Sequence, residues 1–295
     1  MQSSTVVSWS GAGPSPSPQL LTLTCNACAD PDFGEPTPEL IEWLVSKEYA
    51  QERAKLINMG RAAKEVAAGT PPSAGSWAAQ RRTAAEQDAP HTGDTMYLTV
   101  ADQWGTMVSL IQSNYEGFGS GLVVPSLGFG LQDRGSLFNM PTLSGVHTAS
   151  DYEPHKRPFH TIIPGFAFKK NASVPGGWQP WMSFGVMGGN IQPQGHAQIM
   201  SNIIDFGMNP QEAGDAARYT HSGSSQPTGS VMTDGGRTQL EAGVCAAVRA
   251  ELIQRGHSLS SGANGGGYQS ITYDGEANSY IGATEMRKDG IAAGW

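Results

Sequence analysis

The chain has 295 residues with a formal net charge of −8, 15% charged residues and 38% hydrophobic residues. The acidic balance disfavours nucleic acid and anionic membrane as partners. No apolar run approaches the roughly 18 residues that span a bilayer, and the first 24 residues lack the pattern of a secretory signal. The sequence does not indicate a compartment.

The first third of the chain predicts little packed structure. Residues 1–28 are rich in Ser, Pro and Gly, which predicts a disordered or artefactual leader. Within 29–94, Pro38 at a first helical position and an apolar stripe towards Ile57 predict one helix. The polar, Gly/Ala/Ser-rich stretch 60–94 is typical of an exposed linker, where a chain is readily cut.

The three cysteines predict no metal site. Cys25 and Cys28 have the spacing of half a zinc or redox site, but no second Cys or His pair stands at ligand spacing. Cys245 is expected to be a small apolar residue inside a helix. No metal or organic cofactor is expected.

A hairpin is predicted just after the linker. Met96, Leu98 and Val100 alternate with polar or smaller residues, which is the pattern of a strand with one buried face. Asp102–Gly105 supplies the turn, and a second β-rich run covers 107–111. Thr95 opens the first strand.

Further strands and helices follow in the remainder. Strands are expected within 161–187 and 268–283, and the second of these regions is read as a terminal hairpin. Helices are expected at about 194–206 with Ile199, Ile203 and Phe206 on one face, at 210 onwards, and at 240–255. Stacked sheets covered by helices suit this order, an α+β arrangement.

Two interpretations of Thr95 compete. A β-branched residue commonly opens a strand. Alternatively, cleavage of the Asp94–Thr95 bond exposes Thr95 as an N-terminal nucleophile, whose own α-amino group activates its hydroxyl.

Several motifs decide in favour of the nucleophile. In order, the chain carries Gly93-Asp94-Thr95, Ser109-Leu110-Ile111-Gln112-Ser113-Asn114, Gly119-Ser120-Gly121, Arg157-Pro158, Gly185-Val186-Met187-Gly188-Gly189 and Asp289-Gly290. From about residue 29 onwards the sequence resembles the γ-glutamyltransferase family, in its γ-glutamyltransferase-like branch. The resemblance implies an N-terminal-nucleophile hydrolase with an αββα sandwich. It also implies a precursor that cuts itself into a large and a small subunit, with 95–295 as the small-subunit catalytic region and 29–94 as the end of the large one.

The same resemblance implies roles for individual residues. Thr95 matches the nucleophile, Ser113 a hydroxyl that orients it, and Gly188 and Gly189 the amides of an oxyanion hole. His160 and Thr161 stand where relatives contact the donor carboxylate. The implied reaction is hydrolysis or transfer of a γ-glutamyl group, with a donor such as glutathione and with water, an amine or a peptide as acceptor.

Departures from the family pattern keep two alternatives open. Leu137 stands where the well-known members hold the donor α-amino group with a carboxylate. The neighbouring Arg134 and Asp133 are expected to form the contact to the substrate in its place. Together with His160, this favours an acylase of another amide as an alternative. The chain resembles the C-terminal part of the family precursor, which predicts an incomplete sandwich. The other alternative is therefore that the chain is an inactive fragment.

Overall fold

The computed structural model describes residues 30, 32–33, 38–66, 69, 95–138, 151–223, 232–262 and 265–295. The elements are α1 Pro38–Leu44, α2 Lys47–Ala54, β1 Thr95–Ala101, β2 Met107–Ser113, β3 Val123–Val124, β4 Phe129–Gly130, β5 Gly165–Lys170, β6 Trp178–Met187, α3 Ile191–Ile204, α4 Pro210–Asp215, β7 Tyr219–Ser222, β8 Arg237–Leu240, α5 Ala246–Gln254, β9 Leu259–Ser261, β10 Gly267–Asp274 and β11 Ser279–Thr284. Short 3₁₀ turns cover Arg134–Leu137 and Pro175–Gly177.

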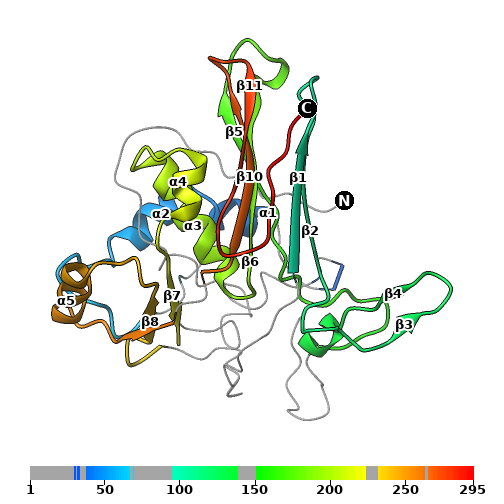
Figure 1. The fold of residues 1–295 in the computed structure, drawn as a ribbon. Helices are drawn as coiled ribbons and strands as arrows, with labels where there is room; N and C mark the ends of the chain where they lie inside the picture. Colours follow the sequence, from blue (N-terminus) through cyan, green and yellow to red (C-terminus); the bar gives the residue numbers. More distant parts are fainter. Residues whose placement is uncertain are drawn as a thin grey trace.

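An antiparallel sheet in the order β11-β10-β6-β5 forms the centre of the molecule. Helices α3 and α4 lie against one face of it, and the β1–β2 hairpin stacks on the other (Figure 1). The expected mixture of stacked strands and covering helices is therefore observed. Within the described ranges, no helix has the length and apolar character needed to cross a bilayer.

Strand β6 is the most buried element of this sheet. Its last six residues, Met182–Met187, are all buried, because α3 packs on one side of the strand and the hairpin on the other. A strand covered on both faces is expected to be apolar or small at every position rather than alternating. The sequence from Met182 to Met187 fits that environment and carries the main core together with Ile199 and Tyr268.

The hairpin buries only one of its two faces. Tyr97 and Ile111 point to the central sheet and join Met187 in a small core cluster. The opposite face is apolar as well, and its side chains are 45% to 59% exposed: Met96, Leu98, Val100, Val108 and Leu110. The predicted alternation is thus confirmed, but the face that the apolar residues occupy is the exposed one. The buried face instead uses Tyr97 and hydroxyl groups.

Those hydroxyl groups define how the hairpin sits on β6. The Thr99 and Ser183 hydroxyls are hydrogen-bonded across the two sheets. The Tyr97 ring lies directly over Gly185, where an added Cβ would come within 2.2 Å of the ring. The Tyr97 hydroxyl is hydrogen-bonded to the Ser109 hydroxyl at 2.7 Å, and burial raises the pKa of Tyr97 to about 12. Polar groups between the sheets therefore have partners, as buried polar groups require.

The helix predicted from Pro38 towards Ile57 is two helices. Ser46 interrupts the helical conformation with a φ of −71° and a ψ of 150°. It is the N-cap of α2, and its side chain accepts a hydrogen bond from the Tyr49 N–H at 3.1 Å. The apolar stripe was therefore misread as continuous, and Leu56 at its end is 64% exposed. The expected leader 1–28 and the linker from 70 to 94 lie outside the described residues.

The start of the predicted linker is attached to the body of the protein. Ala62 N–H donates to the Arg255 carbonyl at 2.7 Å, and Val66 forms a β-bridge with Met232. Residues 60–66 are therefore not the free linker that their composition predicts, because their backbone groups are used in contacts to the α5 region.

The prediction of a helix over 240–255 is wrong for residues 240–245. Leu240 ends β8, which pairs with β7 and β9 in a three-stranded sheet, and α5 starts only at Ala246. Cys245 is exposed and precedes α5, so the prediction that it lies inside a helix is wrong. Gly256 follows the helix with a φ of +93°, a conformation that commonly ends helices.

Helix α3 agrees with its prediction apart from its ends. It starts three residues earlier than expected, at Ile191, and Ile199 is fully buried as predicted. Phe206 lies past the end of the helix and is 71% exposed, so its placement on the buried face was wrong. The terminal hairpin is confirmed as β10 and β11.

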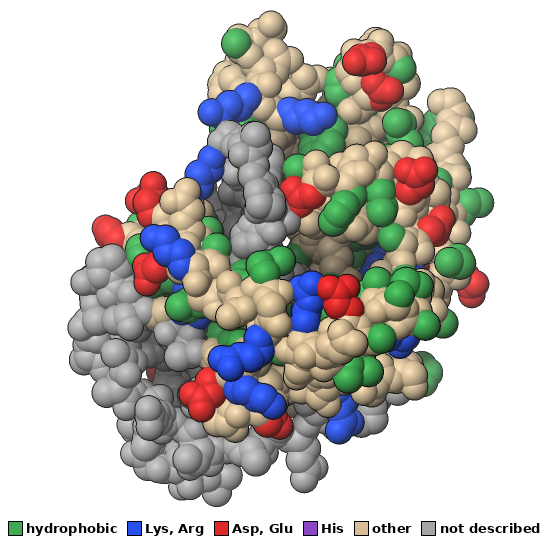
Figure 2. Space-filling model, turned by 90° about the vertical axis from the view of Figure 1, so that its left-hand side faces the viewer, with side chains coloured by type: hydrophobic (Ala, Val, Ile, Leu, Met, Phe, Trp, Pro, Cys, Tyr) green, Lys and Arg blue, Asp and Glu red, His purple; other side chains and the backbone are tan. Residues whose placement is uncertain are grey.

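The surface differs between the two sides of the molecule. Figure 2 shows the side that carries α2 and α5, where Lys and Arg are interspersed with Asp and Glu among small, separate hydrophobic groups. The outer face of the β1–β2 hairpin, in contrast, presents five neighbouring apolar side chains.

Candidate active site

Thr95 and Ser113 lie at the same end of the hairpin. They are opposite each other in the β1–β2 register, and the Thr95 Oγ1 donates a hydrogen bond of 3.0 Å to Ser113 Oγ. Ser113 Oγ also accepts a hydrogen bond from the Tyr115 N–H at 2.9 Å. Both side chains are half-buried. The structure thus brings together the predicted nucleophile and the hydroxyl predicted to orient it.

The contacts between the hairpin and β6 indicate which end of β1 lies near the glycine pair. Thr99 contacts Ser183 and Tyr97 contacts Gly185. A step of two residues along β1 therefore corresponds to a step of two in the opposite direction along β6. Met187, the last residue of β6, packs with Tyr97 and Ile111 in one cluster, so the end of the hairpin that carries Thr95 is nearer to the end of β6 than its turn is. Gly188 follows Met187 immediately.

Gly188 and Gly189 form the turn between β6 and α3. Their φ angles are +130° and +66°, a region that favours glycine. A Cβ at Gly188 would lie 2.7 Å from Ile191 and 2.9 Å from the Gly266 backbone, whereas a Cβ at Gly189 would meet no atom within 4 Å. Close packing thus explains why residue 188 is a glycine. Gly189 faces open space, so a neighbouring side chain does not account for it.

The same turn leads into the N-terminus of a 14-residue helix. The N–H groups at the start of α3 give that end a partial positive charge. Neither Gly188 nor Gly189 donates its N–H to another described residue. Free amides beside a helix N-terminus are suited to stabilise a developing negative charge.

Arg134 and Thr161 contact each other. Arg134, in the 3₁₀ turn, is 4% exposed and donates from Nη1 to Thr161 Oγ1. Its burial lowers the pKa of the guanidinium, which stays far above neutrality in a group of this type. The next residue after Thr161, Ile162, packs against the cluster of Tyr97, Ile111 and Met187. This places the Arg134–Thr161 pair beside the end of the hairpin that carries Thr95.

His160 and Leu137 lie at the edge of this group. His160 is exposed, and partial desolvation, with a smaller contribution from Arg134, lowers its pKa. Leu137 is half-buried in the same turn as Arg134. Asp133, the carboxylate next to that turn, accepts a hydrogen bond from the Glu116 N–H at 3.1 Å.

Tyr115 is a site residue that sequence reasoning missed. Its ring lies 5.3 Å from the Arg134 guanidinium carbon, and its N–H contacts Ser113. It has a φ of +79°, a conformation that is costly for a bulky side chain and concentrates at functional sites. The sequence gives no signal for a positive φ at Tyr115, because residues with this conformation are usually Gly or Asn.

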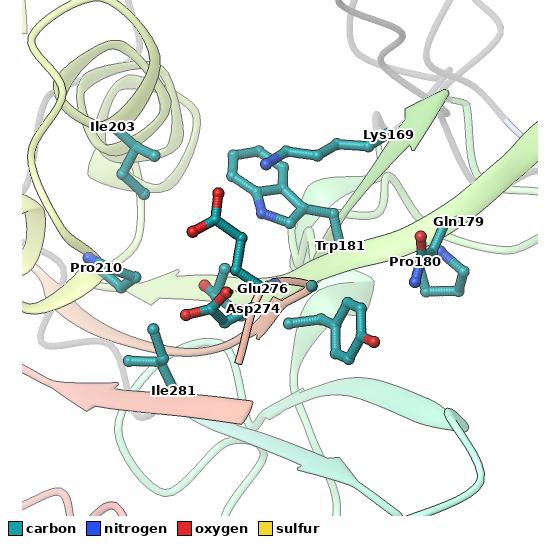
Figure 3. Close-up of a pocket in the computed structure, with 12 residues that line it drawn as sticks. Lys169, Gln179, Pro180, Trp181, Ile203, Pro210, Asp274, Glu276 and Ile281 are labelled. Atoms are coloured by element: carbon teal, nitrogen blue, oxygen red, sulfur yellow. Dashed lines mark hydrogen bonds between the residues drawn. The ribbon is translucent and has the colours of Figure 1, made fainter. Parts of the chain in front are cut away.

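A separate cavity lies on the opposite, helix-covered side of the sheet. Figure 3 shows Asp274 and Glu276 extending into a space beside Trp181, Pro210 and Ile281. The cavity measures about 410 Å³, and none of the predicted site residues lines it. Lys169 covers the Trp181 ring at 4.2 Å. Across the described ranges, His, Cys, Asp and Glu form no group of three or more that could hold a metal ion.

The chain is similar to several known proteins. The cephalosporin acylase of Bacillus halodurans superposes with a TM-score of 0.69 and 37% identity over 92% of this chain and 42% of the acylase chain. A Bacillus subtilis (strain 168) glutathione hydrolase-like YwrD proenzyme is 38% identical over 133 residues, which are 45% of this chain and 23% of that protein. The glutathione hydrolase proenzyme of the same organism is 28% identical over 86% of this chain and 40% of its own length.

The fold is that of the N-terminal-nucleophile hydrolases, an α+β sandwich, as the sequence predicts. The profile of the gamma-glutamyltranspeptidase family matches residues 22–295, and the chain belongs to that family. It spans less than half the length of each of these relatives.

Proposed function

We propose that this chain carries the nucleophilic centre of a γ-glutamyl hydrolase or transferase, with Thr95 as an N-terminal nucleophile. The observation that carries the proposal is the Thr95–Ser113 hydrogen bond at the hairpin end that is nearer to the Gly188–Gly189 turn. Membership of the family supports the reaction class.

Cleavage of the chain comes first in this mechanism. Thr95 Oγ attacks the Asp94 carbonyl carbon, the C–N bond to Thr95 breaks, and the amine takes up the hydroxyl proton. Water then hydrolyses the resulting ester, which releases the Asp94 carboxylate and restores the Thr95 hydroxyl. Residues 95–295 begin with a free α-amino group after this step.

The same atoms act on the donor. The α-amino group accepts the proton of Thr95 Oγ as the oxygen attacks the donor amide carbon. The N–H groups of Gly188 and Gly189 stabilise the oxyanion, an effect of about 3 kcal/mol for each donor. The leaving amine takes the proton from the α-amino group, and an ester on Thr95 remains. Water or an acceptor amine then attacks this ester and releases the acyl product.

An acylase acting on a different amide is the second candidate. Leu137 is an apolar residue at the position where the resemblance calls for a carboxylate to hold a donor ammonium group. The 37% identity to a cephalosporin acylase structure favours the same candidate. Both candidates use Thr95 in the same role and differ in the acyl group.

Processing is tested on a denaturing gel. The wild-type chain is expected to give two bands, residues 1–94 and 95–295, and N-terminal sequencing of the larger fragment should start at Thr95. Thr95→Ala should give one band, and Thr95→Ser should still be cut. A wild-type chain that stays intact at all incubation times contradicts the proposal. It supports the alternative that the chain is inactive by itself and acts only in association with another subunit.

The donor is tested with chromogenic anilides. A γ-glutamyl anilide that is turned over faster than simple acyl anilides supports a glutathione-type hydrolase. The reverse order supports the acylase. Addition of an acceptor dipeptide distinguishes transfer from hydrolysis, because transfer consumes the acceptor.

A further inference from the structure

The cavity on the helix-covered side of the central sheet combines apolar walls with two carboxylates. Its apolar walls come from four elements of the fold, with Trp181 on β6, Ile203 on α3, Pro210 on α4 and Ile281 on β11. Asp274 and Glu276 extend into the space between these side chains (Figure 3). A volume of about 410 Å³ is that of a site for a small molecule.

One polar group that lines the cavity is buried without a partner. Thr272 is 6% exposed, and its Oγ1 has no hydrogen-bond partner among the described residues. Buried hydroxyl groups are normally hydrogen-bonded, because an unsatisfied polar group is costly to bury. Thr272 and Asp274 are two residues apart on β10, so their side chains lie on the same face of that strand. The free hydroxyl and a carboxylate therefore face the same space.

The carboxylates in the cavity lack a cation. Asp274 Oδ1 accepts the Glu276 N–H at 2.9 Å and the Ala277 N–H at 3.2 Å, which fixes this carboxylate at the β10–β11 turn. Neither Asp274 nor Glu276 forms an ion pair with a described residue. Lys169 is the one basic residue among those that line the cavity, and its Nζ lies over the Trp181 ring at 4.2 Å. The charged and polar groups that remain without a partner are thus hydrogen-bond acceptors.

We propose that this cavity binds a small organic amine in its ammonium form. An ammonium group has three N–H donors and no acceptor, which matches the oxygens of Thr272, Asp274 and Glu276. The apolar part of the amine packs against the four apolar walls. An anionic ligand would meet two like charges, and a bare metal ion would leave the apolar walls without a partner.

This site is separate from the proposed catalytic centre. The hairpin that carries Thr95 stacks on one face of the central sheet, whereas the cavity lies on the face covered by α3 and α4. Binding of the amine therefore does not depend on the role of Thr95, and the inference can fail or hold independently of the proposed function.

Isothermal titration calorimetry on the full-length wild-type chain tests the ligand class at pH 7. It compares 2-phenylethylamine, which is an ammonium ion at this pH, with 2-phenylethanol, which is neutral and similar in shape, and with the anion 3-phenylpropanoate. The amine is expected to bind about 10- to 100-fold more tightly than the alcohol, as for hydrogen bonds to charged groups. The anion should bind more weakly than the alcohol. Equal affinity of amine and alcohol, or no saturable binding of the amine, overturns the proposal. Saturable binding of calcium chloride that displaces the amine also overturns it, because the carboxylates then form a metal site.

A charge-neutral double variant assigns the preference to the cavity. Asp274→Asn combined with Glu276→Gln removes both charges, and the Asn side chain keeps an oxygen acceptor for the turn. The preference for amine over alcohol should be lost. The matched control is Glu42→Gln combined with Glu52→Gln, which neutralises two exposed residues of α1 and α2 outside the cavity and should keep the preference. An unchanged preference in the folded double variant overturns the proposal, because the amine then binds elsewhere.

Thr272→Val provides a test that conserves the packing. It replaces a hydroxyl without a partner by a methyl group, so the free energy of unfolding of the free chain should not fall. Affinity for the amine should fall about three- to tenfold, as for the loss of one hydrogen bond. A purely structural role of Thr272 would not produce this combination, and unchanged affinity overturns the proposal. If circular dichroism shows that the double variant does not fold, Thr272→Val decides.

Discussion

Thr95 and Ser113 face each other across the two strands of one hairpin, with 3.0 Å between their hydroxyl oxygens. Ser113→Ala removes the acceptor that, in the proposed mechanism, orients the Thr95 hydroxyl. A hydrogen bond of this kind contributes about 1 kcal/mol, so chain cleavage and anilide turnover should slow about five- to tenfold. Ser113→Thr keeps the hydroxyl and should retain most of the rate. The rate of appearance of the 95–295 fragment on a gel measures the first effect. An Ala variant that cleaves at the wild-type rate would show that the contact is incidental.

Gly185 is expected to be intolerant of any side chain. A Cβ at this position would lie 2.2 Å from the Tyr97 ring and cannot fit unless the hairpin shifts. Overpacking of this kind costs about 1–3 kcal/mol, so Gly185→Ala should lower the free energy of unfolding by that amount and also slow chain cleavage. Denaturant titration measures the first effect and a gel the second.

The control for Gly185 is Gly177→Ala in the β5–β6 turn. An added Cβ there meets no atom within 4 Å, although its φ of +72° still strains the backbone. Gly177→Ala should therefore leave chain cleavage at the wild-type rate. If both variants cleave equally fast, the stacking of Tyr97 on β6 does not control the site.

His196 is expected to make stability depend on pH. Its Nε2 accepts the Val186 N–H at 3.2 Å, and desolvation lowers its pKa to about 4. Because the unfolded chain has the higher pKa, about 6.5, it binds the proton more tightly between these values. The contribution to stability is therefore complete above pH 6.5 and is lost as the pH falls towards 4, by up to about 3 kcal/mol.

This pH effect is measured by denaturant unfolding at pH 7.5 and at pH 5. His196→Gln keeps an acceptor for the Val186 N–H and does not titrate. The difference in free energy of unfolding between the wild-type and variant chains should shrink at the lower pH. A constant difference across the range would mean that His196 does not contribute to the pH dependence.

Replacement of apolar residues with Thr should have different effects on the two faces of the hairpin. Leu98 and Leu110 are a cross-strand pair on the exposed face, at 52% and 47% exposure. Replacing both with Thr should raise solubility and leave the melting temperature nearly unchanged, because little burial is lost. Static light scattering and a thermal melt measure the two effects.

Tyr97 and Ile111 are the matched pair on the buried face of the hairpin. Replacing both with Thr should lower the free energy of unfolding by several kcal/mol, since large buried side chains are truncated. A soluble, stable variant of this second kind would contradict the assignment of the buried face.

The sequence predicted the hairpin, the β10–β11 pair and helix α3 because each has a local signal. Alternating residues, a Gly in a turn and apolar residues at helical spacing act over a few positions. The division of 38–57 into α1 and α2 was missed because Ser46 acts as an N-cap only when the chain turns there. The strand at Leu240 was missed because its partners, β7 and β9, are distant in the sequence.

In the candidate site, too, some residues follow from motifs in the sequence, whereas other contacts do not. Thr95, Ser113 and the glycine pair could be predicted from their resemblance to family motifs, and the register pairs the first two. The contact between Arg134 and Thr161 joins segments 27 residues apart, and no periodic pattern predicts it. The left-handed conformation of Tyr115 depends on what surrounds it, which no single-residue propensity encodes.

Tyr97 and Thr99 attach β1 to Gly185 and Ser183 of the central sheet, so the position of the hairpin and the position of Thr95 are coupled. A change at any of these four positions that moves the hairpin also moves the Thr95 hydroxyl, because Thr95 begins the same strand. Natural variation at these positions should therefore alter the stability of the chain and the rate of its cleavage together.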